Sequence, residues 1–293
     1  MSPLTTSEVS APKALDIQHD TDPARDHGPA KHIPHIGHAL LFFVIAWLSL
    51  SLCVLVVLAA AHLHSEEQIK AHQGLAMLGQ AGSYVLTLAI AWVLFPRLWD
   101  QPFSKGIEWN VLAAKRWWYW IMLAGAAISG LAQFALRFVA EPKSSPLDQV
   151  LRTTHGAWLM TGFGVLLAPV TEEIAFRGFL LPALAIAYDW LAMERTPAGL
   201  QKWQSSSMHS RAALIFASIF SSIPFALMHA GQLQHAWGAL GILYAVSLVL
   251  SAVRVRTNSV GCSVLMHATY NLTVFIVLFV GTDGYRHMEK FLH

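Results

Sequence analysis

The chain has 293 residues, of which 55% are hydrophobic and 12% charged, and its formal net charge at pH 7 is +2. Soluble domains carry roughly 25% charged residues, so this composition excludes an ordinary soluble protein and predicts a membrane protein. Strands that alternate apolar and polar residues are absent from the sequence. We therefore expect an all-α, polytopic transmembrane helical bundle.

Before the first apolar segment, residues 1–38 are polar and rich in proline, which predicts a disordered tail. The tail lacks the basic start and apolar core of a cleavable signal peptide, so the first span is expected to be an uncleaved anchor. Lys and Arg residues flank the spans more often on the N-terminal side than on the other side. This excess places the N-terminus in the cytoplasm.

Several apolar segments are long enough for a hydrocarbon core of about 30 Å, which takes about 20 helical residues. They are residues 39–61, 75–96, 117–139, 157–189, 212–230, 236–253 and 259–281. The segment 157–189 contains Pro169, Gly178 and Pro182, so it is either one kinked helix or a helix with a short second one. The choice gives seven or eight spans and decides on which side the C-terminus lies.

The second and third of these segments carry small and polar residues inside apolar sequence. Gln80, Ser83 and Tyr84 are expected to make ordinary polar contacts between helices. Gly125, Ser129 and Ala132, spaced by four and three residues, form a face of small side chains. Such a face predicts close packing of this helix on a neighbour.

Three charged residues cluster in the middle of the segment 157–189, between positions 172 and 177, where an ionisable side chain costs a few kcal/mol and indicates a functional site. On a helix Glu173 and Arg177 are about 40° apart, so they are expected to form an ion pair. Glu172 points about 140° away from Arg177. It is therefore left to face a pocket, where a desolvated carboxylate suits general-base work on water.

Two later apolar helices carry further pairs at one-turn spacing, Phe225-x-x-x-His229 and His267-x-x-x-Asn271. We expect Phe225 to be a packing residue. A neutral His229 can hold an attacking water together with Glu172, while His267 and Asn271 offer donors for a developing oxyanion. These residue types together predict hydrolysis.

Other interpretations of the same residues stay open at this point. Glu172, His229 and His267 could instead be a zinc ligand set with an open position for water, which also gives hydrolysis. The polar groups could be contacts between helices, or a proton or cation relay in a transporter. A non-catalytic membrane immunity or binding protein is a further alternative. The inverted repeats typical of a transporter are absent.

The three motifs match a known pattern when they are taken in order. Glu172-Glu173-x-x-x-Arg177, Phe225-x-x-x-His229 and His267-x-x-x-Asn271 resemble the CPBP family of intramembrane proteases. This family includes the type II CAAX prenyl endopeptidases and bacteriocin-processing or immunity proteins. The resemblance covers about residues 157–281, and residues 39–139 look like accessory transmembrane helices.

The resemblance implies a conical, water-accessible cavity that opens toward the cytoplasm and toward lipid. It implies that Glu172 and His229 activate water and that His267 and Asn271 stabilise the oxyanion, so that a metal is unnecessary. Glu173, Arg177 and Phe225 would support these groups.

The expected partners follow from the same resemblance. They are the lipid bilayer and a membrane-associated protein or peptide, with a prenylated CAAX-type substrate as one option, and no nucleic acid. The expected location is a multi-pass membrane protein with a cytoplasmic N-terminus, in the plasma or inner membrane if the source is bacterial.

Overall fold

The computed structural model describes residues 32–63, 65, 68, 72–139, 146–206 and 208–290, so most of the predicted tail lies outside the described residues. Within these ranges the chain forms helices and no strand, which confirms the predicted all-α class. The first helices are α1 (Ile36–Ala60), α3 (Gln73–Trp99), α4 (Phe103–Gly106), α5 (Val111–Leu136), α6 (Pro146–Leu151) and α7 (Thr154–Gly162). A long central part follows as η1 (Phe163–Leu167), α8 (Ala168–Glu173), η2 (Ile174–Leu180) and α9 (Leu181–Ala192). The remaining helices are α10 (Pro197–Ser205), α11 (Arg211–Leu227), α12 (Trp237–Thr257), α13 (Val260–Gly281) and η3 (Met288–Lys290).

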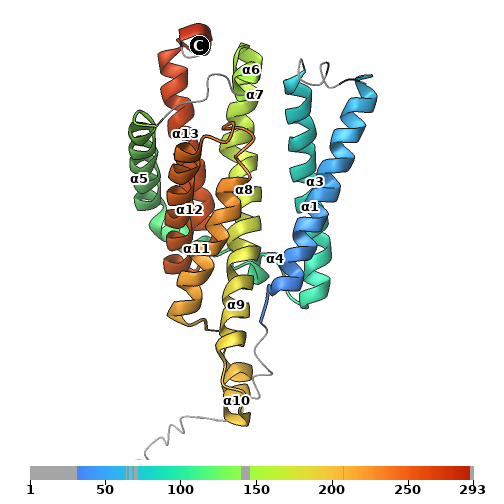
Figure 1. Ribbon diagram of the computed structural model, residues 1–293, viewed down its shortest axis with the longest axis vertical. Helices are drawn as coiled ribbons and strands as arrows, with labels where there is room; N and C mark the ends of the chain where they lie inside the picture. Colours follow the sequence, from blue (N-terminus) through green and yellow to red (C-terminus); the bar gives the residue numbers. More distant parts are fainter. Residues whose placement is uncertain are drawn as a thin grey trace, which may run out of the picture.

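Six helical stretches in the described residues are long and apolar enough to cross a membrane. They are α1, α3, α5, the continuous stretch Thr154–Ala192, α12 and α13. The predicted segment 212–230 forms α11, which is apolar but has only 17 residues. The chain is thus a polytopic helical membrane protein. Because Thr154–Ala192 runs straight through the bundle, the start of α1 and the end of α13 lie at opposite ends of the molecule (Figure 1).

The central stretch Thr154–Ala192 is one helix that contains two π-helical segments, η1 and η2. Each segment closes one residue before a proline: the N–H of Ala168 bonds to the Phe163 carbonyl, and that of Leu181 bonds to the Phe176 carbonyl. Pro169 and Pro182 have no N–H and disturb regular α-helical bonding. The helix therefore widens locally at each proline instead of breaking, which resolves the predicted alternative in favour of one continuous helix.

Several helices begin at a short polar residue that caps free backbone groups. Asn110, Thr153, Ser210 and Ser259 each accept a hydrogen bond from the backbone N–H three residues later. Such caps satisfy donors that have no partner within the helix. Asn258 ends α12 with a left-handed backbone, φ 46°, which is common just past a helix end. These local signals account for the boundaries of α5, α7, α11, α12 and α13.

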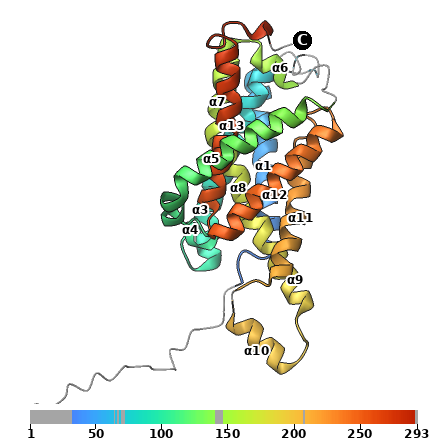
Figure 2. The same cartoon turned by 90° about the vertical axis from the view of Figure 1, so that its left-hand side faces the viewer.

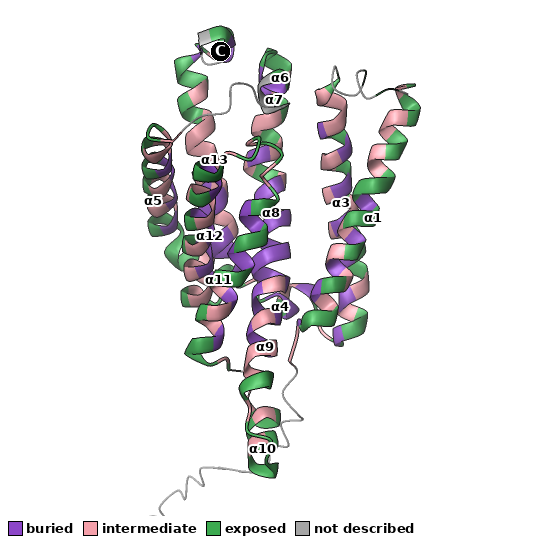
Figure 3. Ribbon diagram, viewed as in Figure 1, coloured by how far each residue is buried: buried purple, intermediate pink, exposed green. Residues whose placement is uncertain are grey.

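Burial separates the central helix from the outer ones (Figure 3). In the most apolar window of Thr154–Ala192 61% of residues are buried, against 17% in α1. On the outer helices large apolar side chains such as Trp47, Leu55 and Leu131 are about two-thirds exposed. An apolar surface of this extent fits contact with lipid tails and not with water.

An aromatic cluster joins α1, α3 and α4 to the central helix. The Phe179 ring of η2 lies 4.5 Å from the Phe42 ring and 4.7 Å from the Phe95 ring, centroid to centroid. Trp99 and Phe103 complete the cluster at 5.6 and 6.2 Å from Phe179. Offset and tilted ring pairs at these distances are favourable beyond their burial. The cluster fixes the first two spans beside η2.

The face of small residues on α5 packs closely against α13, as predicted (Figure 2). Gly125, Ser129 and Ala132 are all buried. A Cβ added at Gly125 would lie 2.8 Å from the Met266 carbonyl oxygen and 3.1 Å from the Thr269 Cβ. Only a residue without a side chain allows the two backbones to approach this closely.

We predict that Gly125→Ala lowers the unfolding free energy by about 1–3 kcal/mol, because the added methyl group forces α5 away from α13. The measurement is thermal unfolding of the detergent-solubilised protein. Gly130→Ala is the matched control, since a Cβ at Gly130 of the same helix meets nothing within 4 Å. Equal Tm values for the two variants would contradict this account of the α5–α13 contact.

Candidate active site

The two adjacent glutamates end α8 and lie between the two π-helical segments. The Glu173 side chain is completely buried, whereas that of Glu172 keeps 8% of its surface exposed. A π-helical turn adds a residue to the turn and often occurs at functional sites. The two carboxylates thus sit in the most buried helix of the bundle but in different surroundings.

The predicted ion pair between Glu173 and Arg177 is present. The Arg177 Nη1 lies 2.8 Å from the Glu173 Oε1, and both side chains are buried. The Arg177 Nη2 donates to the backbone oxygen and to the Oγ of Ser247 on α12, at 2.8 and 2.7 Å. The Phe225 ring of α11 covers the guanidinium at 4.5 Å, a cation–π contact. Phe225 is therefore a packing residue that also stabilises a buried charge.

His267 of α13 lies between the two glutamates. Its Nδ1 is 2.9 Å from the Glu173 Oε1, and its Nε2 is 4.0 Å from the Glu172 Oε2. A carboxylate can only accept, so the Nδ1 of His267 carries the donated proton. The Nε2 of His267 consequently faces Glu172.

His229 lies in the turn directly after α11 and not on the helix itself. Its Nδ1 is 2.9 Å from the backbone oxygen of Phe225, and its Nε2 is 4.0 Å from the Glu172 Oε2. A carbonyl oxygen can only accept a hydrogen bond, so the proton of the His229 ring is on Nδ1. The lone pair of the His229 Nε2 therefore points toward the Glu172 carboxylate. The short length of α11 places this turn below the upper ends of α7 and α13 in Figure 1.

The Glu172 Oε2 thus faces the Nε2 atoms of two imidazoles, each at 4.0 Å. A water molecule that forms hydrogen bonds of about 2.8 Å to both the carboxylate oxygen and one imidazole nitrogen fits between them at this distance. In a tetrahedral zinc site with bonds of about 2.0–2.2 Å, ligand atoms lie only about 3.4 Å apart. Across the described ranges, no group of three or more His, Cys, Asp and Glu side chains could hold a metal ion. The three side chains therefore do not fit zinc as they are placed here.

Asn271 of α13 contacts the central helix through one amide hydrogen. Its Nδ2 donates to the Gly164 carbonyl at 2.6 Å. In a π-helical turn this carbonyl would be reached by residue 169, which is proline and has no N–H, while the N–H of Ala168 already bonds to Phe163. Asn271 thus supplies the donor that Pro169 lacks. Its second amide hydrogen is left for another acceptor.

Two residues near these groups were not among the predicted site residues. Ser247 lies on α12, where no motif marks it, and is found only through its bonds to Arg177. Tyr84 of α3, predicted to be an ordinary polar contact between helices, accepts a hydrogen bond from the Nε2 of Gln80 of the same helix at 3.3 Å, and its ring lies 5.4 Å from the Phe163 ring at the start of η1. The sequence signal for Tyr84 is a polar side chain in an apolar span.

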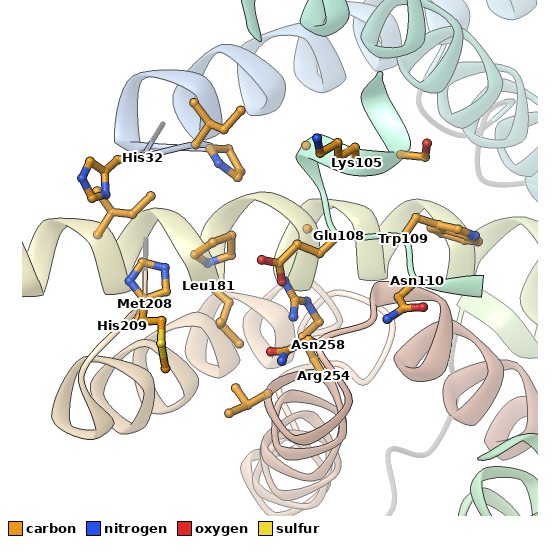
Figure 4. A pocket seen from close by; sticks show the side chains of 18 of the residues that line it. His32, Lys105, Glu108, Trp109, Asn110, Leu181, Met208, His209, Arg254 and Asn258 are labelled. Carbon is orange, nitrogen blue, oxygen red and sulfur yellow. The ribbon is translucent and has the colours of Figure 1, made fainter. Parts of the chain in front are cut away.

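A separate cavity of about 950 Å³ lies near the N-terminal ends of α1, α5 and α13 (Figure 4). Its polar lining includes His32, Lys105, Glu108, His209, Arg254 and Asn258. Arg254 is paired with Glu108 across it, and burial lowers the pKa of the His32 imidazole. None of the seven residues of the three motifs lines this cavity, so it is not the conical cavity that the resemblance implies.

Comparison with known families bears directly on the central and C-terminal helices. Residues 154–273 match the family model described as "Type II CAAX prenyl endopeptidase Rce1-like". Residues 154–273 are an Rce1-like domain. The match confirms the resemblance to the CPBP and CAAX protease family. No curated protein and no solved structure matches the chain.

The Rce1-like domain runs from the start of α7 into α13 and includes Glu172, His229, His267 and Asn271. Its family implies an intramembrane protease whose substrate is a peptide or protein in the bilayer. Helices α1, α3, α4 and α5 lie outside the match. The accessory role predicted for residues 39–139 stays a prediction.

We predict that Glu173→Ala and Arg177→Ala each lower the unfolding free energy by about 3–5 kcal/mol, because each leaves a buried charge without its partner. The double variant should lose clearly less than the sum of the two. Thermal unfolding of the four proteins measures this cycle. Arg256→Ala, at the exposed end of α12, is the control and should change stability by less than about 0.5 kcal/mol. Strict additivity would show that the two side chains do not depend on each other.

Proposed function

We propose that this protein is an intramembrane endopeptidase that hydrolyses a peptide bond of a membrane-associated protein or peptide through water activated by Glu172 and His229. The observation that carries the proposal is the position of the Glu172 Oε2, which faces the Nε2 atoms of His229 and His267, each at 4.0 Å. Membership of residues 154–273 in the Rce1-like family supports the reaction class.

The proposed reaction starts from a water held between Glu172 and the Nε2 of His229. Glu172 takes one proton of the water as its oxygen attacks the carbonyl carbon of the peptide bond. The carbonyl oxygen becomes an oxyanion in the tetrahedral intermediate. When the C–N bond breaks, the proton on Glu172 passes to the leaving nitrogen, which leaves a carboxyl end and an amine as products.

The oxyanion would be stabilised from α13. Asn271 contributes the amide hydrogen that Gly164 does not use, and Gly164 itself holds the amide in position. His267 donates its Nδ1 proton to Glu173, so its Nε2 serves as a donor when the ring carries both protons. One missing oxyanion donor typically costs about 10²–10³ in kcat.

The substrate class that we propose first is a prenylated protein with a CAAX-type C-terminus. The description of the matching family names this class. The bilayer location of the domain suits a substrate that is already anchored in lipid. A farnesylated CAAX peptide and the same peptide without the prenyl group are therefore the appropriate pair of probes.

We predict that Glu172→Gln lowers cleavage of the farnesylated peptide at least 10²-fold while membrane insertion and Tm stay as in the native protein, because glutamine keeps the shape and cannot take a proton. Peptide cleavage in proteoliposomes, followed by mass spectrometry, provides the measurement. Glu194→Gln, on an exposed glutamate after α9, is the matched control and should cleave normally.

Two outcomes would contradict the proposal. Normal cleavage by the Glu172→Gln variant would remove Glu172 from the reaction. Absence of cleavage by the native protein with prenylated peptides, unprenylated peptides and membrane extracts would favour a non-catalytic binding or immunity role.

Water activation without a metal predicts that activity survives chelation. Because the separation of 4.0 Å between Glu172 and each imidazole is wide for zinc, dialysis against 1,10-phenanthroline should leave kcat unchanged in protein shown to be metal-free by elemental analysis. Loss of activity that returns on addition of zinc would instead establish the zinc site formed by Glu172, His229 and His267.

A further inference from the structure

The cavity near the N-terminal ends of α1, α5 and α13 is separate from the groups of the proposed reaction. Its volume of about 950 Å³ is at the upper end of the range for small-molecule sites, about 300–1,000 Å³. The segment 101–110, α9 and the end of α12 contribute to its lining (Figure 4). Transmembrane helices end and begin here: α3 ends at Trp99, α5 begins at Val111 and α13 begins at Val260. The cavity is therefore at the level of the lipid headgroups.

Arg254 of α12 is the buried cation of this cavity. Its side chain is 6% exposed, and the one hydrogen bond that the described residues give its guanidinium runs from Nη2 to the Oε2 of Glu108. The Nε of Arg254 is buried and has no hydrogen-bond partner in the same part of the chain. A guanidinium has five N–H donors, and buried donors without acceptors are costly. Further acceptor oxygens beside Arg254 would lower that cost.

The partner of Arg254 is much less buried. The Glu108 side chain is 56% exposed, and it belongs to the turn between α4 and α5. Its backbone is fixed independently of the ion pair, because its carbonyl accepts from the N–H of Val260 at 3.1 Å. An exposed carboxylate is well hydrated and gains little from pairing. The Glu108 carboxylate can therefore turn into water and leave Arg254 to another anion.

A second cation lines the cavity from the end of α4. Lys105 is exposed and makes no ion pair with the residues that the structure describes. Among the lining residues Glu108 is the one carboxylate, whereas Lys105 and Arg254 are both cations at neutral pH. The lining thus has one positive charge more than its carboxylate balances.

The two histidines of the lining are already bonded to other groups. The His32 Nε2 lies 3.0 Å from the Trp203 carbonyl oxygen, and the His209 Nδ1 lies 3.2 Å from the Asp189 Oδ2. Asp189 itself does not line the cavity. The excess of positive charge in the lining is therefore not offset by a second carboxylate.

Another part of the lining is apolar. It includes Leu181 and Ile186 of α9, Leu214 of α11 and Val255 of α12. A phosphate ion is much smaller than this cavity and would contact only the polar part. A ligand that fills both parts has an anionic group joined to an apolar one.

We propose that this cavity binds an anionic phospholipid, with the lipid phosphate at Arg254 and Lys105 and the start of the acyl chains against the apolar part of the lining. Guanidinium and ammonium groups are the usual partners of phosphate oxygens. Basic pockets between transmembrane helices bind anionic headgroups in this way. Such binding is independent of the proposed protease activity, because no residue of the three motifs lines the cavity.

The first arm of the experiment identifies the ligand. Tm of the delipidated full chain in detergent is measured with dioctanoyl-phosphatidylglycerol, with dioctanoyl-phosphatidylcholine and with inorganic phosphate at equal concentrations. We expect the anionic lipid to raise Tm by about 3–6 °C at about ten times its Kd, and the other two to leave Tm unchanged. An equal rise with phosphatidylcholine would indicate a general lipid effect, and an equal rise with inorganic phosphate would indicate a soluble anion. Either result would overturn the assignment to an anionic lipid.

The second arm locates the site by measuring the Kd of dioctanoyl-phosphatidylglycerol with native mass spectrometry. Lys105→Ala should weaken binding about 5-fold, and Arg254→Met should weaken it at least 10-fold because its guanidinium is buried. Arg256→Ala is the matched control: it removes one positive charge from the same end of α12, but Arg256 does not line the cavity. Lys105 is exposed, so its variant tests the site even where Arg254→Met does not fold.

The third arm changes the carboxylate that shares Arg254 with the lipid. Glu108→Gln should tighten binding of phosphatidylglycerol about 3-fold, because the phosphate no longer competes with a carboxylate for the guanidinium. Weaker binding by Glu108→Gln would show that the lipid does not take the place of this carboxylate and would overturn the proposal. The same conclusion would follow if Lys105→Ala bound the lipid as tightly as Arg256→Ala.

Discussion

A carboxylate and a guanidinium that are buried side by side in the membrane set the geometry of this site. Either charge alone would be costly at that depth, and the short contact between Glu173 and Arg177 offsets much of the cost. The two paired side chains also contact three other helices: Arg177 donates to Ser247 of α12 and lies under the Phe225 ring of α11, and Glu173 accepts from His267 of α13. Three helices are thereby held around η2 by a single ion pair.

The same pairing separates the roles of two consecutive glutamates. The Oε1 of Glu173 bonds to a guanidinium and an imidazole, and the side chain is completely buried. Glu172 is one residue away, yet it faces two imidazole nitrogens that leave room for a water. Two carboxylates whose surroundings differ in this way can take different chemical roles on one helix. In the proposed mechanism one glutamate maintains the structure and the other carries out the reaction.

Local periodicity was enough to predict much of this arrangement. The apolar segments marked the spans to within a few residues, the spacing of Glu173 and Arg177 predicted their ion pair, and the small residues around Gly125 predicted the close contact of α5 with α13. Contacts between distant segments were not accessible in the same way. The bond from Asn271 to Gly164 spans 107 residues, and Ser247 bonds to Arg177 from a helix that carries no motif. The ligand types for a zinc alternative can be identified from the residues alone, but only the arrangement of the helices determines the distances between them.

The two π-helical turns divide the long central helix into three segments whose relative rotation is adjustable. Each turn contains one residue more than regular α-helical bonding requires, and each ends beside a proline. Loss of one residue from η1 would return that turn to α-helical bonding and rotate everything before it by about 100°, with a shift of about 1.5 Å along the axis. A single-residue insertion or deletion at one of these turns would therefore rotate the flanking helical segment, and with it the contacts of that segment, while the glutamate pair in α8 keeps its place.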